Sequence, residues 1–295
     1  MKCNTVKGYL FAILSAIIYG CMPLMAKNIY ADGVTPLTLV FLRNFFSLLP
    51  LAALAYKEKK TLKFPLKLLP SISLISLLGC CVTPILLFGS YQFIPSGTAT
   101  VFHFIYPAVV VISEILFLKK KAQAGNVISV LLCIAGISFF YSPGESLNLT
   151  GSVLALLSGI TFACYVILLS HFDNCNISGF LFCFYVAAIS SIAALIVCVS
   201  TNSLVFPSSL PGWGLCVLFS LLVTTGAVAL FQQSAFLIGS ERTSILSTLE
   251  PITGVLLGAI AFGESLVLRT VIGSMLVVTA SILIAFFDIH KKGIP

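Results

Sequence analysis

The stretch SERTSILSTLEPITGVLLGAIAFGES, residues 240–265, places one carboxylate beside a proline inside an apolar segment. Glu250 lies eight residues beyond Arg242, the last charge before the apolar run, which is about 12 Å at a helical rise of about 1.5 Å per residue. An ionisable group so deep in an apolar helix usually faces a cavity or a partner. We therefore interpret Glu250 as part of the wall of a solute pathway. The alternative is a protonated glutamate hydrogen-bonded between packed helices.

The helix expected over residues 243–262 carries a polar stripe. Pro251 has no backbone N–H and loosens the preceding turn, so a polar side chain or water is expected nearby. Residues three or four apart share one helical face. On this face the small and polar residues are Thr243, Ser247, Glu250, Gly254 and Gly258. Ser247 therefore joins Glu250 as a candidate substrate-binding residue.

The composition of the 295-residue chain is typical of a membrane protein, because 59% of the residues are apolar and only 8% are charged. A soluble fold would have too few charges to cover its surface. The net charge of +7 would suggest a nucleic-acid partner in a soluble protein, but no zinc-finger, basic-helix or Gly-rich phosphate motif is present. We expect the chain to lie in a lipid bilayer and to bind no nucleic acid.

The motifs of several enzyme classes are absent from the sequence. It contains no G-x-x-x-x-G-K-[ST] for ATP, no H-E-x-x-H for zinc and no G-x-S-x-G for a serine hydrolase. The ten cysteines lie mostly inside apolar runs and never as C-x-x-C, which favours buried thiols over metal ligands or disulfides. We expect no enzyme activity, no cofactor and no metal site.

Apolar runs of about membrane-spanning length alternate with short polar breaks, so neighbouring helices must be antiparallel. The first run follows Lys2 and Lys7 as a signal peptide would. Its length and its recurrence later in the chain indicate a retained helix instead. The sequence thus predicts ten transmembrane helices, at residues 8–26, 36–56, 69–93, 97–118, 125–141, 151–169, 177–199, 213–237, 243–262 and 267–287.

The distribution of Lys and Arg predicts the orientation in the membrane. Thirteen of the 16 lie at the termini and in the loops of one side, whereas the opposite side holds only Lys27 and Arg269, and Arg43 lies inside a helix. Because Lys and Arg are enriched in cytoplasmic loops, both termini are predicted to be cytoplasmic. The predicted location is the cell (cytoplasmic) membrane.

The second half of the chain repeats the first. GYLFAILSAIIYGC at residues 8–21 aligns with GSVLALLSGITFAC at 151–164 at an offset of 143, and Pro107 aligns with Pro251 at an offset of 144. Two five-helix repeats are therefore predicted. They occupy residues 1–141 and 151–295, and a linker at 142–150 joins them.

An odd number of helices in each repeat has a topological consequence. The second repeat must start on the side opposite to the first, so the predicted fold class is an all-α membrane protein with ten transmembrane helices in two inverted five-helix repeats. Inverted repeats have two nearly equivalent packings, one open to each side, with the binding site between the halves. The alternative is a duplication that left only a symmetric scaffold.

Three short motifs, together with the topology and the repeat, carry a family resemblance. With L-E-P-I at 249–252, G-E at 263–264 and I-G at 272–273, the sequence resembles an EamA-type permease of the drug/metabolite transporter superfamily over nearly its whole length. The first repeat departs from the pattern, because lysines at 119–120 stand in place of G-E and Tyr106 replaces the acid. The resemblance implies a secondary carrier that exports amino acids or related metabolites, bound between the third, fourth, eighth and ninth helices.

Arg43 lies deep in the helix expected over residues 36–56. It is eight residues from Thr35 on the outer side and 14 from Lys57 on the inner side, which is about 12 Å and about 20 Å along a helix. A guanidinium at that depth needs a carboxylate, and its fork suits either Glu250 or a substrate carboxylate. The alternatives are a structural ion pair and a surface arginine whose head reaches the interface.

Further candidates are a histidine and three tyrosines near the expected midplane. His103 could relay protons or contact substrate, although a hydrogen bond to a hydroxyl or carbonyl would equally satisfy it. Tyr19, Tyr106 and Tyr165 would give an apolar pocket a few placed hydroxyls, which suits a neutral or zwitterionic solute. Glu114 lies within five residues of lysines predicted to be cytoplasmic, which favours pairing with them over transport.

These observations predict a secondary active transporter that works by alternating access on a small-molecule substrate, with Glu250 as the proton-coupling candidate. The sequence leaves open a passive facilitator or channel for small solutes, and an uptake carrier for a vitamin or nucleoside-like metabolite. It also leaves open whether the chain works as a monomer or as a homodimer.

Overall fold

The computed structural model describes residues 2–59, 65–116, 124–139, 148–172, 178–239, 242–243, 246–247, 249–262 and 268–291. Within these ranges all regular secondary structure is helical, as the apolar runs predicted. Seven helices of the described chain are long and apolar enough to cross a membrane, and shorter apolar helices span Val127–Ser138 and Val271–Ala280. The predicted class, an all-α membrane protein, is therefore confirmed.

Ten helical rods follow one another along the described residues, as predicted. Three rods are composite: a π-helix, η2, joins α3 to α4, a second π-helix, η3, joins α10 to α11, and a tight turn joins α5 to α6. The bounds are α1 Lys2–Ala31, α2 Pro36–Lys59, η1 Leu66–Leu68, α3 Leu69–Ser76, η2 Leu77–Val82, α4 Thr83–Ser90, α5 Ser96–His103, α6 Tyr106–Leu116, α7 Ala124–Ser138, α8 Leu149–His171, α9 Gly179–Ser200, α10 Leu210–Phe219, η3 Ser220–Val228, α11 Ala229–Ile238, α13 Leu249–Phe262 and α14 Leu268–Lys291.

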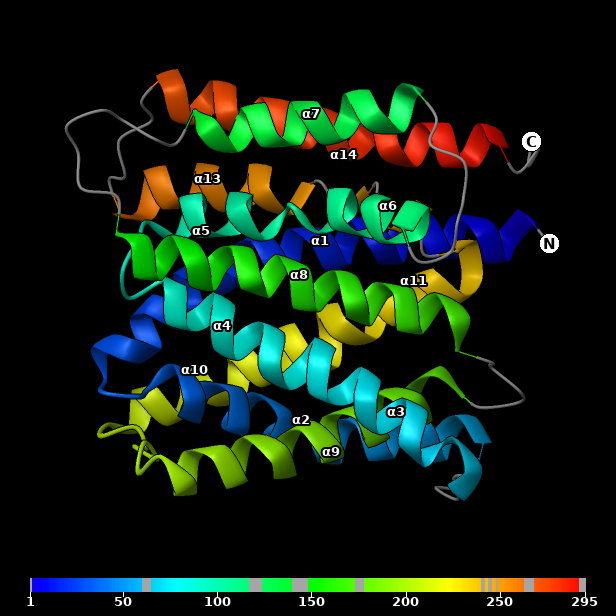
Figure 1. The fold of residues 1–295 in the computed structure, drawn as a ribbon. Coiled ribbons are helices and arrows are strands. Elements are labelled where there is room, and N and C mark those ends of the chain that lie inside the picture. The colour runs from blue at the N-terminus through cyan, green and yellow to red at the C-terminus, as the bar shows by residue number, and fades with distance from the viewer. Residues whose placement is uncertain are drawn as a thin grey trace.

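The rods of the two repeats interlock in equivalent pairs. α2 packs against α9 along one edge of the bundle, and α7 packs against α14 along the other (Figure 1). In the interior, α1 packs on α11 and α13, whereas α8 packs on α4, α5 and α6. The first rod of each repeat therefore lies against the third and fourth rods of the other repeat. This exchange of equivalent contacts is what two inverted repeats predict.

The start of α1 and the end of α14 lie on the same side of the bundle (Figure 1). An even number of antiparallel rods requires this arrangement. Since five rods make one repeat, α8 starts the second repeat on the opposite side. The two halves consequently have opposite orientations.

The helix predicted over residues 97–118 is divided into two helices near Pro107. α5 ends at His103 and α6 begins at Tyr106. Pro107 has no N–H to donate to the carbonyl of His103, so the helical ladder breaks there. Gly159 of α8 packs against this freed carbonyl, and a Cβ added at Gly159 would lie 2.6 Å from its oxygen. The break is therefore closely packed against α8, which only a residue without a side chain permits at position 159.

The helix predicted over residues 243–262 is interrupted at the equivalent place. α13 begins at Leu249, and the amide of Glu250 donates to the carbonyl of Ser247 at 2.9 Å. Pro251 has no N–H for that carbonyl, so a tight turn satisfies it instead. Pro251 thus lies in the first turn of α13, where a missing N–H costs little, and not deep inside the helix predicted over residues 243–262.

The two π-helices also occupy equivalent positions in the repeats. η2 and η3 overlap when the chain is shifted by the repeat offset. Each continues directly from an α-helix of the same rod, η2 from α3 and η3 from α10. π-Helical turns are rare and often occur at functional sites. Gly79 and Cys80 of η2 and Val228 of η3 line the cavity described next.

Candidate functional site

A cavity lies between the two repeats. It holds about 500 Å³ of space free of protein atoms, including its open side. Both repeats contribute to its wall, which consists of Tyr19, Met22, Arg43, Gly79, Cys80, Thr83, Pro84, Leu87, Phe88, His103, Phe162, Tyr165, Val228 and Glu250. Five predicted site residues, Tyr19, Arg43, His103, Tyr165 and Glu250, are therefore brought together.

Arg43 enters the cavity from α2 and is only 3% exposed. Its guanidinium carbon lies 5.6 Å from the centre of the Phe88 ring, so the cation rests on an aromatic face. The Nε atom is buried without a hydrogen-bond partner. Ser220 of η3 donates to the backbone carbonyl of Arg43 at 2.5 Å, which fixes α2 against the second repeat.

Glu250 enters from the first turn of α13 and is 8% exposed. Its helix is held close to α1, because a Cβ added at Gly20 would overlap Thr253 and approach the carbonyl of Glu250 at 3.1 Å. Gly254 lies one turn further along, near the same stretch of α1. Gly254 of the predicted stripe thus lies near α1, and Glu250, one turn before it, reaches the cavity.

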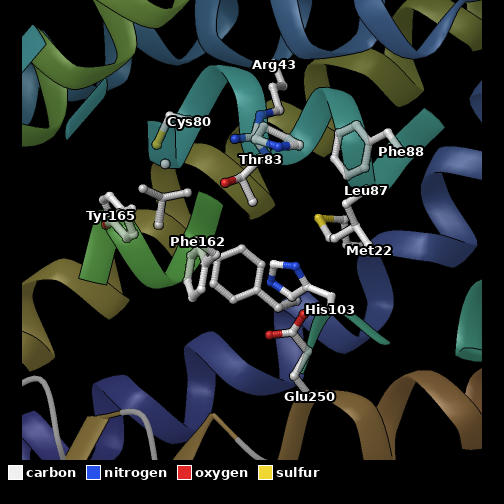
Figure 2. Close-up of a pocket in the computed structure, with 14 residues that line it drawn as sticks. Met22, Arg43, Cys80, Thr83, Leu87, Phe88, His103, Phe162, Tyr165 and Glu250 are labelled. Atoms are coloured by element: carbon white, nitrogen blue, oxygen red, sulfur yellow. The ribbon is translucent and has the colours of Figure 1, made fainter. Parts of the chain in front are cut away.

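Arg43 and Glu250 lie on opposite walls of the cavity (Figure 2). No ion pair links them in the described part of the chain, although Glu250 was one of two partners predicted for Arg43. The other predicted partner, a substrate carboxylate, remains a prediction. The cavity therefore holds a cationic wall and an acidic wall that face the same space.

His103 lies at the C-terminal end of α5, on the same wall as Glu250 (Figure 2). It is 4% exposed, and its Nδ1 lies 2.9 Å from the hydroxyl of Ser158. Ser158 in turn donates to the carbonyl of Ala155 at 2.6 Å. The predicted alternative, a hydrogen bond to a neighbouring hydroxyl, is present, and the ring also lines the cavity.

Tyr165 closes another part of the wall from α8 and is 2% exposed. Gln232 donates to its hydroxyl at 3.2 Å, and Cys183 donates to the amide oxygen of Gln232 at 2.7 Å. The ring packs directly on the backbone of η2, because a Cβ at Gly79 would overlap it. Tyr19 is partly buried and lines the same cavity from α1.

Two predicted site residues lie outside the cavity wall. Tyr106 is 1% exposed and packs its ring against Phe162 with a centroid separation of 4.9 Å. Ser247 is buried and donates to the carbonyl of Thr243 at 3.0 Å, within the turn that precedes α13. Both residues support neighbours of the site in this conformation.

The sequence predicted no site residue in η2 or α4, although the resemblance implied that their rod, the third, borders the site. Thr83 lines the cavity, and its hydroxyl is 2.7 Å from that of Thr161 on α8. Phe88 supports Arg43, and Cys80 lies beside them in the wall. The one available signal was Pro84, which interrupts an otherwise regular apolar helix.

Several expectations concern parts of the chain outside this description. The side chain of Glu114, residues 119–121, the G-E at 263–264 and most of the linker at 142–150 lie outside the described residues. Within the described residues no group of His, Cys, Asp and Glu could hold a metal ion, and the eight cysteines described are free thiols.

Comparison with known proteins identifies the family. A model of the EamA-like transporter family matches residues 6–142 and 149–286. A protein of Clostridium kluyveri described as an uncharacterized transporter is 25% identical over 294 residues, which cover 94% of this chain and 92% of that protein. The uncharacterized inner membrane transporter YicL of Salmonella typhimurium is 23% identical over 288 residues, which cover 96% of each chain.

A solved crystal structure shares the fold with a TM-score of 0.69 at 12% identity, and the match covers 95% of this chain and 97% of that chain. The family match spans both repeats and nearly all of the rods described above. The protein is therefore a multi-pass membrane transporter, and it belongs to the EamA-like transporter family.

Proposed function

We propose that this transporter is a secondary carrier that exports zwitterionic amino acids, or related small metabolites, by alternating access. One observation carries the proposal: Arg43 and Glu250 face the same cavity from opposite walls, and neither has an ion-pair partner among the described residues. A buried charge without a partner is costly. A solute with one charge of each sign would satisfy both walls at once.

The proposed pose follows from the chemistry of the two side chains. A guanidinium binds a carboxylate through parallel N–H donors, so the substrate carboxylate would lie at Arg43. The substrate ammonium, which has only donors, would lie at Glu250. The aromatic and aliphatic wall between them, formed by Phe88, Leu87 and Phe162, suits an apolar side chain.

Proton coupling is part of the proposal. A proton and a substrate ammonium would compete for the carboxylate of Glu250, so binding one would release the other. Such competition at a single carboxylate is sufficient to exchange an outgoing solute for an incoming proton. The proposal also includes cytoplasmic termini, which the positions of Lys and Arg support. It further includes a linker between the repeats at residues 142–150.

The test of the cationic wall is Arg43→Lys in purified protein reconstituted into liposomes. Lysine keeps the charge but loses the bidentate geometry, so affinity for amino acids should fall by about tenfold or more. Amines that lack the carboxylate should bind as they do to the wild type. Arg242→Lys, the same exchange outside the cavity, is the control. Equal losses for both substrate sets would contradict a carboxylate at Arg43.

The test of the acidic wall is Glu250→Gln in the same liposomes. The neutral amide cannot exchange a proton, so transport driven by a pH gradient should stop, and transport should lose its pH dependence. An unchanged rate and pH profile would exclude Glu250 as the coupling group. Counterflow in the wild type separates a carrier from a channel, because only a carrier transiently accumulates labelled solute while unlabelled solute moves the other way. Accumulation driven by a pH gradient separates the coupled carrier from a passive facilitator.

A further inference from the structure

The contact between His103 and Ser158 has a defined direction. The hydroxyl of Ser158 donates to the carbonyl of Ala155 at 2.6 Å. A serine has one hydroxyl proton, so the same hydroxyl must accept the hydrogen bond from His103 Nδ1 at 2.9 Å. Nδ1 therefore carries a proton. In the neutral ring this leaves Nε2 as an unprotonated acceptor.

The acceptor side of the imidazole belongs to the cavity. His103 lines the cavity, and within the described residues its recorded hydrogen bond is the one to Ser158. The carboxylate of Glu250 points toward the same imidazole (Figure 2). Two acceptors from different repeats, one on α5 and one on α13, thus line the same wall of one cavity.

We propose that Ser158 is a positioning residue that holds His103 as a hydrogen-bond acceptor, so that His103 and Glu250 together bind the ammonium group of the substrate. This inference rests on the zwitterionic substrate proposed above and adds the second acceptor and the residue that orients it. An ammonium group presents three donors and no acceptor. A solute without that group leaves both acceptors unpaired, and a site built for a hydrogen bond rejects such an analogue strongly.

The backbone around His103 supports a fixed ring. Gly159, the neighbour of Ser158, packs directly on the carbonyl of His103. The ring also contacts Phe162 at a centroid distance of 5.1 Å and Tyr106 at 6.0 Å. Gly159 and Ser158 come from the same turn of α8, so a shift of α8 would move the imidazole of His103 with it.

The repeat supplies a matched control serine. Ser15 stands where Ser158 stands in the other repeat, is 1% exposed, and donates to the carbonyl of Ala227 at 2.8 Å. Its hydroxyl has no imidazole partner among its recorded bonds. Ser15→Ala therefore repeats the loss of a buried helical hydroxyl without touching His103.

The first measurement is the tautomer of His103, read from nitrogen chemical shifts of protein labelled in its three histidines, with His103→Gln for assignment. The wild type, Ser158→Thr and Ser15→Ala should show the proton on Nδ1. Ser158→Ala should show a mixture or the Nε2–H form. A wild-type ring with its proton on Nε2 would overturn the inference without reference to any substrate or to the folding of a variant.

The second measurement is binding of the standard amino acids and of the matching carboxylic acids without the amino group, such as phenylalanine and 3-phenylpropanoate. Ser158→Ala should weaken amino-acid binding by about tenfold, the scale of one hydrogen bond to a charged group, and leave the acids unchanged. Ser158→Thr, which keeps a hydroxyl, should retain the wild-type preference for an amino acid over its matching acid. Ser15→Ala should retain the same preference.

Failure of the proposed substrate class and failure of the inference about Ser158 give different results. If wild-type protein binds none of these amino acids better than its acid, the zwitterionic substrate class is wrong. If the wild type shows the preference and Ser158→Ala keeps it, or loses both ligands equally, Ser158 has a structural role only and the inference is wrong.

Discussion

Gln232 shows how a residue outside the cavity sets the chemistry inside it. Its side chain is fully buried at 0% exposure, accepts from Cys183 at 2.7 Å and donates to Tyr165 at 3.2 Å. Because the phenol oxygen is already an acceptor, its own proton is left to donate elsewhere. The hydroxyl of Tyr165 is therefore a donor, which suits a substrate carboxylate or carbonyl.

Gln232→Leu should remove this constraint. We expect weaker binding of carboxylate substrates, by about threefold to tenfold, and a stability loss of about 1–3 kcal/mol because Cys183 and Tyr165 lose a buried partner. Ligand titration and thermal unfolding of the same preparations measure both effects. Gln233→Leu, at the neighbouring and only partly buried position, is the control. Equal effects at both positions would contradict a specific role for Gln232.

At the scale of single residues, depth along a helix was a sufficient guide to Arg43, His103 and Glu250. Each is a polar group far from the ends of the helix expected from the sequence, and such groups face cavities or partners. Depth could not predict Ser158 or Gln232 as their supports, because those contacts depend on how α5 and α8, or α8 and α11, cross. Phe88 was missed for the same reason, since an apolar residue in an apolar helix carries no signal.

At the scale of elements, the sequence predicted the rods, and Pro107 and Pro251 mark where two of them are interrupted. It did not predict the conformation of the chain at each interruption. Whether a proline bends or breaks a helix depends on what satisfies the freed carbonyl. Here Gly159 approaches the carbonyl of His103, and the amide of Glu250 bonds that of Ser247. These partners are set by packing and local turns that periodicity does not reveal.

Hydrogen bonds between the turn after α1 and the start of α10 also join the two repeats. Asp32 accepts from the amide of Ser209, the N-cap of α10, at 3.2 Å and from the hydroxyl of Ser208 at 3.0 Å. A negative charge is favourable at the start of a helix. Hydrogen bonding by Ser209, and then by Ser208, lowers the pKa of Asp32 below its usual value of 3.8.

This shift predicts a loss of stability in acid. Because the pKa is lower in the folded state, the stabilisation is fully present above the unfolded-state value and is lost as the pH falls toward the folded-state value. Thermal unfolding between about pH 6 and about pH 3 should therefore show a decline that Asp32→Asn reduces. The variant should also melt slightly lower near neutral pH. A variant as sensitive to acid as the wild type would assign the decline to other carboxylates.

At the scale of the whole molecule, the repeat was the most informative feature of the sequence. An offset of 143 to 144 residues and an odd number of helices were enough to predict opposite orientations, because topology follows from counting. The pairing of α2 with α9 and of α7 with α14 was not predicted, since two inverted five-helix units can associate through different faces. The observed exchange, with α1 and α8 each inserted against the other repeat, places the cavity between the halves.

Both ends of the bundle carry hydrogen bonds that join the repeats. At one end Thr35 donates to the carbonyl of Ser203 at 2.8 Å, beside the contacts of Asp32 with Ser208. At the other end Ser178 donates to Glu58. If the cavity opens alternately to each side, we expect contacts that tie the halves at one end to break while those at the other end hold.

Locking one end therefore tests alternating access directly. In a background without the native cysteines, Asp32→Cys with Ser208→Cys should form a disulfide on oxidation, because the native side chains already touch. Transport in liposomes should fall in proportion to the crosslinked fraction measured by mass spectrometry, and a reductant should restore it. Each single variant, oxidised in the same way, should keep its rate. Full transport by completely crosslinked protein would mean that the halves need not separate at this end, and a pore through a static bundle would then explain the movement of solute better than a carrier.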